Sequence, residues 1–176
     1  NLMLFGSFSK GYRGGTYNGL AFQSAAQVYF VEPEVVDVIE FGFKSRLFDD
    51  TVQLNASAFY YDYEGQQNQV IDPNSTTFLI NLDGEMRGFE VELVVVASDR
   101  LRFNAGLGVL DTEFDGGNCG NATQVGALPQ DGNCIFTAAG VIDVGGNPFP
   151  YAAQNSANLG MDWYLGQLGQ GDLKLH

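Results

Sequence analysis

The chain has 176 residues, a length that fits one domain, and 45% of them are apolar, which argues against a disordered chain. Its formal net charge of −13 would repel nucleic-acid phosphates, so we expect no nucleic-acid partner. The 23 glycines, 14 phenylalanines and 8 tyrosines favour strands and tight turns over helices. The acidity fits either a solvated soluble surface or acidic external loops.

The ends of the chain indicate a fragment. Residues 1–10 lack the basic region and apolar core of a signal peptide. Residues 173–176 have the pattern of a strand that has only begun. The chain contains no run of about 18 apolar residues, so we expect no transmembrane helix.

Apolar and other residues alternate along most of the chain, as they do in strands with one half-buried face. In the stretch 51–63, Val52, Leu54 and Ala56 share one face, and polar residues alternate with them. Helical spacing is absent. The predicted strands, in chain order, are 2–9, 36–47, 51–63, 88–97, 101–109 and 157–165.

The connections between these strands alternate in length. Short turns fall at 48–50, 98–100 and 166–171, whereas long segments fall at 14–32, 65–76 and 115–147. Short turns at one end and long loops at the other are typical of outer-membrane β-barrels. A soluble β-sandwich more often has loops of comparable length at both ends.

On the apolar face, the first charged residues lie about ten residues or more from the nearest short turn. An outer-membrane strand crosses an apolar band about 25 Å tall, so this face should stay uncharged for roughly ten residues beyond a short turn. Ser45 is the main polar exception below that height. Trp163 near a short turn and Tyr60 near a long loop suit interfacial girdles, although aromatics favour strands in any setting. The first charges on this face are Asp37, Asp62, Arg87 and Asp111.

The opposite face is polar and carries charges of both signs. Such a face suits a water-filled interior or contact with a plug, and it argues for a barrel too wide to be filled by its own side chains. About six complete strands are too few for a wide barrel, so more strands must come from elsewhere. The polar-face residues are Glu40, Lys44, Arg46, Gln53, Asn55, Glu90, Glu92, Arg102, Asn104 and Asn158.

An ordered series of short motifs resembles TonB-dependent receptors. Residues 1–19 resemble the family's SxSKGYRxGxYN segment, and residues 33–45 resemble its PExxDxxExGxKS strand. Residues 147–153 resemble the NxPxxAP pattern at which the family's chain returns to the barrel. The resemblance covers nearly the whole chain in order. Residues 83–85 depart from it, because the family often has a small-residue turn there.

The resemblance implies an all-β fold, an antiparallel transmembrane β-barrel segment that is part of a large, roughly 22-stranded barrel with a plug. Residues 1–176 would be a partial barrel domain without the plug and the final strands. The implied function is TonB-energised uptake, across the bacterial outer membrane, of a scarce ligand such as a ferric siderophore, cobalamin or an oligosaccharide. The implied partners are the inner-membrane TonB complex, outer-membrane lipid and lipopolysaccharide, and the extracellular ligand.

Other functions stay open on the residues alone. A passive porin or structural barrel would have no plug and no TonB box upstream. A soluble secreted all-β binding module would stay monomeric in water without detergent. An outer-membrane enzyme would need a nucleophile and a base; Ser7 and Lys10 match a Ser-x-x-Lys spacing, but alternation puts them on opposite faces. We therefore expect no enzyme, no catalytic residues and no cofactor.

Metal-binding motifs are weak. Residues 111–116 begin like a calcium loop, but its twelfth position holds Ala122 instead of glutamate, so an EF-hand is excluded. A looser calcium site in an external loop stays open beside a plain solvated loop. His176, the one histidine, cannot build a zinc site with this chain alone.

Tyr12, Arg13 and Tyr17 are the candidate ligand-binding residues, because they lie where the first strand enters a long loop. An arginine flanked by aromatic side chains suits an anionic ligand. The alternative is a loop that packs on its own barrel, where aromatics also occur.

We predict that Cys119 and Cys134 form a disulfide that closes an external loop, because an even number of cysteines in a segment rich in Gly, Asn and Asp suits an oxidising compartment. Two free thiols are the alternative. Mass spectrometry of the non-reduced, alkylated protein checks this, and finding both thiols alkylated would exclude the disulfide.

Overall fold

The computed structural model describes residues 1–19, 28–71, 77–116, 134–137, 140–168 and 171–176. Within these ranges the regular structure consists of strands. None of the described residues belongs to a helix that is long and apolar enough to cross a membrane.

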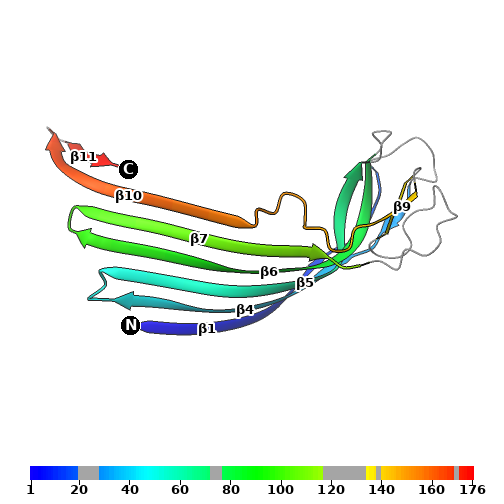
Figure 1. Ribbon diagram of the computed structural model, residues 1–176, viewed down its shortest axis with the longest axis horizontal. Helices are drawn as coiled ribbons and strands as arrows, with labels where there is room; N and C mark the ends of the chain where they lie inside the picture. The colour runs from blue at the N-terminus through cyan, green and yellow to red at the C-terminus, as the bar shows by residue number, and fades with distance from the viewer. Residues whose placement is uncertain (20–27, 72–76, 117–133, 138–139, 169–170) are drawn as a thin grey trace.

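A single antiparallel sheet of seven strands makes up most of the described chain (Figure 1). Two short pairs lie in the connections: β2 (Thr16–Tyr17) with β3 (Phe30–Val31), and β8 (Cys134–Thr137) with β9 (Gly140–Asp143). The seven strands, in sheet order, are β1 (Leu2–Arg13), β4 (Glu34–Leu47), β5 (Val52–Ile71), β6 (Thr77–Ser98), β7 (Leu101–Phe114), β10 (Asn155–Leu168) and β11 (Gly171–Leu175).

The sheet is open, and its two ends differ. Among the described residues, β1 and β11 are each paired on one side only, so the sheet is not closed into a barrel within this part of the chain. The short turns between β4 and β5 and between β6 and β7 lie at the same end as both termini (Figure 1). The long connections lie at the opposite end, as predicted.

All six predicted strands are present, and each contains more residues than predicted. A seventh strand, β11, lies where the sequence predicted that a strand begins near the C-terminus. The prediction of a long loop over residues 65–76 was wrong, since β5 continues to Ile71 and β6 begins at Thr77. The glutamines of this stretch give no apolar alternation, but pairing of Gln66 with Leu82 and of Gln67 with Asn81 satisfies their backbone. Residues 83–85, which depart from the small-residue turn that the family often has, lie within β6.

The register confirms the two predicted faces. Residues directly opposite each other on neighbouring strands share a face of the sheet. One row across six strands is entirely apolar: Leu4, Phe43, Ala56, Val91, Leu107 and Ala157. The row beside it belongs to the other face and is mostly polar: Met3, Lys44, Asn55, Glu92, Gly106 and Asn158.

The apolar face has no second layer over it in the described part of the chain. Leu4, Phe41 and Leu159 are 74%, 66% and 83% exposed. A β-sandwich would bury these side chains against another sheet. The cluster of buried apolar residues lies instead beside the long connections and contains Ile80, Leu82, Phe114 and Val144. This arrangement argues against the soluble binding module.

The first charges on the apolar face line up at one height, as predicted. Arg87 lies opposite Asp111, and its guanidinium approaches that carboxylate to 2.8 Å. Lys10 lies opposite Asp37, with 3.1 Å between Nζ and Oδ1. We call these side chains the charged rim: Lys10, Asp37, Asp62, Glu85 and Glu113 in one row, and Arg87 and Asp111 in the adjacent row.

Ser45, the polar exception on the apolar face, is satisfied locally. Its hydroxyl donates a 2.7 Å hydrogen bond to the carbonyl oxygen of Leu54 on the neighbouring strand, and only 6% of the residue is exposed. A hydroxyl with a protein partner does not need water, so the position is compatible with an apolar setting.

Adjacent residues of β5 provide a matched test of the two faces. Ala56 lies in the apolar row, whereas Ser57 faces the polar side, opposite Glu90. We expect Ala56→Arg to lower the free energy of unfolding by about 2–4 kcal/mol in lipid vesicles, because it puts a charge near mid-bilayer. Ser57→Arg should change it little. Denaturant unfolding of the full-length protein measures both, and equal costs for the two variants would contradict the assignment of the faces.

Candidate functional site

The polar face divides into two zones along the strands. Nearest the long connections are three rows that we call the upper wall. Nearer the short turns are the rows of Phe5, Met3 and Asn1, which we call the lower wall. The upper wall consists of Ser7, Glu40, Phe59, Gly88 and Leu110, then Ser9, Val38, Tyr61, Met86 and Thr112, then Gly11, Val36, Tyr63, Gly84 and Phe114.

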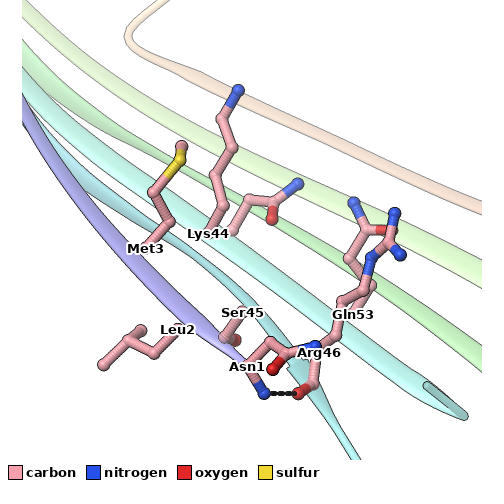
Figure 2. A pocket seen from close by; sticks show the side chains of 8 residues that line it. Asn1, Leu2, Met3, Lys44, Ser45, Arg46 and Gln53 are labelled. Atoms are coloured by element: carbon pink, nitrogen blue, oxygen red, sulfur yellow. Dashed lines mark hydrogen bonds between the residues drawn. The ribbon is translucent and has the colours of Figure 1, made fainter.

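The lower wall is charged and hollowed. A hollow of about 350 Å³ is lined by residues that include Lys44, Arg46, Gln53 and Asn55 (Figure 2). A second hollow of about 330 Å³ lies beside it, and its lining includes Glu40, Ser57, Glu90 and Glu92. Charges of both signs therefore lie in this zone, as predicted for the polar face, with Lys44 and Arg46 on β4 and Glu90 and Glu92 on β6.

Aromatic rings form a continuous ledge on the upper wall. Alternate residues of a strand point to the same side, so Phe59, Tyr61 and Tyr63 of β5 lie in a line. The rings of Phe59 and Tyr61 meet edge to face with centroids 5.6 Å apart, and those of Tyr61 and Tyr63 are stacked at 6.2 Å. Phe149 extends the line, 5.9 Å from Tyr63 and 4.6 Å from Phe114. We call Phe59, Tyr61, Tyr63, Phe114 and Phe149 the aromatic ledge.

Phe149 belongs to the segment that returns from the β7–β10 connection to the sheet. Its backbone N–H donates to the Thr112 hydroxyl at 3.0 Å, and the N–H of Phe114 donates to the carbonyl of Asn147 at 3.0 Å. Its ring lies over Gly84, where a Cβ would approach the ring to 2.8 Å, so a side chain at position 84 would displace it. The returning chain is thereby held against the upper wall before β10 begins.

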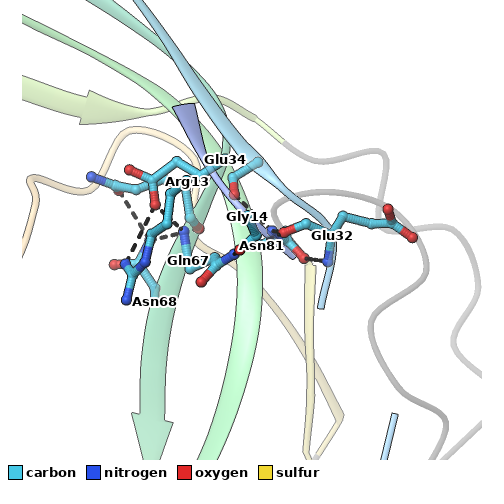
Figure 3. A network of polar contacts seen from close by, with 9 residues as sticks. Arg13, Gly14, Glu32, Glu34, Gln67, Asn68 and Asn81 are labelled. Atoms are coloured by element: carbon cyan, nitrogen blue, oxygen red, sulfur yellow. Dashed lines mark hydrogen bonds and ion pairs between the residues drawn. The ribbon is translucent and has the colours of Figure 1, made fainter. Parts of the chain in front are cut away.

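A set of hydrogen bonds, the polar clasp, joins the end of β1 and the start of β4 to the β5–β6 hairpin (Figure 3). The Asn81 side chain donates to the carbonyls of Glu32 and Gly65 at 2.9 and 2.6 Å, and accepts from the Glu32 N–H at 2.9 Å. The Gln67 amide donates to the carbonyls of Gly14 and Glu32 at 3.0 Å each. The polar clasp consists of Arg13, Gly14, Glu32, Glu34, Gly65, Gln67 and Asn81.

Gly65 is where β5 changes register within this clasp. The pairing with β6 shifts between Tyr63 and Gln66, and Gly65 has φ of +67°. A Cβ here would lie 2.8 Å from the carbonyl oxygen of Pro33, so glycine is required both by conformation and by space. Beyond this point the β5–β6 hairpin bends away from the direction of the other strands (Figure 1).

The three predicted ligand-binding residues do not form one cluster. Arg13 is on the polar face, with Nη1 3.6 Å from the Glu34 carboxylate, and its side chain is 62% exposed. Tyr12, its neighbour in β1, must point to the opposite side, and it is 72% exposed. Tyr17 lies in β2, where its ring meets Phe30 edge to face at 5.4 Å.

Acidic side chains surround the end of β7 beyond the charged rim. Burial raises the pKa of the Asp115 carboxyl above its ordinary value, and repulsion from Asp83, Asp62 and other carboxylates adds to the shift. Among the described residues, no group of three or more His, Cys, Asp or Glu side chains is arranged to hold a metal ion. The start of the calcium-like motif is instead the end of β7, where Asp111 pairs with Arg87.

The predicted disulfide falls outside the part of the chain that the structure describes. Cys119 lies between the described ranges, and for Cys134 only the backbone at the start of β8 is described. The pairing of the two cysteines therefore stays a prediction.

Comparison with known proteins identifies the family. The model of the "TonB dependent receptor-like, beta-barrel" family matches residues 1–174. Among solved structures, the siderophore receptor PiuA from Acinetobacter baumannii superposes with a TM-score of 0.52 at 19% identity, over 90% of this chain and 22% of that chain. At this identity the likeness concerns the fold alone. No curated protein matched the chain.

The chain spans about a fifth of the length of the PiuA chain, which agrees with an open sheet instead of a closed barrel. The family model begins before β1 and ends within β11, the last strand of that sheet, and the family consists of receptors and transporters. The chain belongs to the TonB-dependent receptor family, as a stretch of its β-barrel domain.

Proposed function

We propose that the full-length protein takes up a scarce ligand across the bacterial outer membrane with energy supplied through TonB. The observation that carries this proposal is the contrast between the two faces of one sheet. In the described part of the chain no second layer covers the apolar face, and the other face bears a charged lower wall and an aromatic ledge beside the long connections. Such a sheet suits a barrel with lipid outside and a hydrated, ligand-binding interior.

The positions of the short turns and the long connections at opposite ends of the strands suggest how the sheet is oriented in the membrane. The short turns lie in the periplasm and the long connections outside the cell, as in other outer-membrane barrels. Outer-membrane lipid would cover the apolar face, and lipopolysaccharide would contact the charged rim. The free-energy cost of a charged side chain is small at that height, because lipid headgroups and water are close.

The lower wall is the surface that we propose for contact with the plug. It carries Lys44 and Arg46 close to Asn55, and Glu92 accepts a 3.3 Å hydrogen bond from the Asn55 amide. The plug and the region that contacts TonB would lie in other parts of the full-length protein. The work of this chain would be binding and positioning, with no catalytic step.

Tyr12, Arg13 and Tyr17 remain proposed ligand contacts at the mouth. Arg13 has its charge balanced by Glu34, so it would act mainly as a hydrogen-bond donor to the ligand. Tyr17 would offer the exposed side of its ring, since the residue is 65% exposed. Tyr12 points away from Arg13 and would reach a ligand only through the outer surface of the loops.

Uptake by the proposed transporter depends on TonB, whereas uptake through a passive porin does not. We expect a strain that expresses the full-length gene to lose uptake of the ligand when tonB is deleted, while binding of that ligand to whole cells persists. Uptake of radiolabelled ligand and binding at 4 °C measure the two steps. Transport that continues at an unchanged rate without TonB would support the porin and contradict the proposal.

Arg13 offers a test that separates ligand contact from a structural role. If Arg13 contacts the ligand, Arg13→Ala should weaken binding about tenfold, because a charged hydrogen-bond donor is lost, while Arg13→Lys should keep part of the affinity. Gln67→Ala is the matched control, since it loosens the same clasp without removing a cation. Equal loss of affinity in Arg13→Ala and Gln67→Ala would show that Arg13 only holds the clasp together.

A further inference from the structure

We infer that the upper wall is a platform for an uncharged, hydroxyl-rich ligand, such as a neutral oligosaccharide, and not for an anionic ferric complex. This inference rests on the proposed uptake function and names its ligand class. It comes from two independent properties of the same surface: the flat aromatic ledge, and the excess of carboxylates over cations around it.

The aromatic ledge has the shape that a sugar or another flat, weakly polar face needs. Tyr61 and Tyr63 are nearly parallel, with 14° between their ring planes, so they present adjacent faces along one line. Both residues are half-buried, held by Phe59 below and by Phe149 above. A preformed ledge of this kind binds apolar faces at a small cost in side-chain entropy.

The upper wall offers no uncompensated positive charge in its described part. Its three rows contain a single charged residue, Glu40, which lies opposite Phe59. The nearest cation on this face toward the loops is Arg13, already paired with Glu34. Lys10 and Arg87 are at a similar height but on the opposite face, and each contacts a carboxylate. Toward the short turns the nearest cation on this face is Lys44, which lines the same hollow as Glu40, Glu90 and Glu92. Carboxylates thus outnumber cations around the ledge, and an anion there would meet a net negative surface.

The remaining polar groups suit a neutral partner with hydroxyl groups. Ser7 and Ser9 of β1 lie in the same rows as Phe59 and Tyr61, and Glu40 adds a carboxylate that accepts hydrogen bonds. A few polar groups around an aromatic surface give orientation and specificity to a bound ligand, while the rings supply most of the contact area.

The test measures binding to the full-length receptor in detergent by isothermal titration. The probes are a panel of neutral oligosaccharides with α- and β-linked glucose, xylose and mannose, and a ferric tricatecholate as the anionic complex. We expect at least one neutral oligosaccharide to bind and the ferric tricatecholate not to bind. Binding of the ferric tricatecholate alone, or of neither class, overturns the inference.

Substitutions in β5 test whether the bound probe contacts the aromatic ledge. We expect Tyr61→Ala to weaken binding about tenfold or more, and Tyr61→Phe to retain most of it, because the ring supplies the contact. Tyr60→Ala is the matched control, since Tyr60 is next in β5 but lies on the apolar face, where its hydroxyl bonds Glu85. A neutral probe whose affinity is unchanged in Tyr61→Ala would overturn the assignment to this surface.

Different results would contradict the inferred ligand class and the proposed uptake function. If the ferric tricatecholate is imported only in cells that contain TonB, the proposed function holds and the ligand class is wrong. If a neutral oligosaccharide binds the ledge and enters equally well without TonB, the ligand class holds and the proposed function is wrong.

Discussion

The whole structure depends on the register between neighbouring antiparallel strands. Side chains alternate between the two faces, so a slip of one residue would bring the polar-face charges of a strand onto the apolar side. Aromatic side chains lying over glycines of the next strand hold this register on the polar face. A Cβ at Gly42 would come within 2.5 Å of the Phe5 ring, and one at Gly88 within 2.9 Å of the Phe59 ring. Each ring therefore fits beside one glycine and would collide with a side chain one position away.

This register sets the height along the strands at which each zone of the two faces lies. On the apolar side, uncharged rows end at a charged rim in which Lys10 and Arg87 pair with carboxylates. On the other side, a charged and hollowed lower wall gives way to the aromatic ledge at the height of that rim. The rim marks where hydrocarbon would end, and the ledge lies behind it, close to the long connections and to water. The same alternation thus separates membrane contact from ligand contact.

Alternation and spacing predicted the strands, the two faces and the height of the first charges, because these depend on residues close together in sequence. The longer β5–β6 hairpin was missed because Gln66 and Gln67 carry no apolar pattern, although both pair with β6 through the backbone. The polar clasp joins Asn81 to Glu32, and the ledge joins Phe149 to Tyr63, contacts that local patterns do not contain. A signal for the ledge was present, since Phe59, Tyr61 and Tyr63 place three aromatics on a face otherwise rich in polar residues.

The most direct test asks which face meets hydrocarbon. Single cysteines at Leu107 and Asn158, in a background with Cys119→Ser and Cys134→Ser, would carry an environment-sensitive fluorophore on the full-length protein in phospholipid vesicles. The two positions lie in adjacent rows of opposite faces. We predict that nitroxide-labelled lipid quenches the fluorophore at position 107 and that aqueous iodide quenches it at 158. The reverse pattern, or protection of position 107 from both quenchers, would contradict the account.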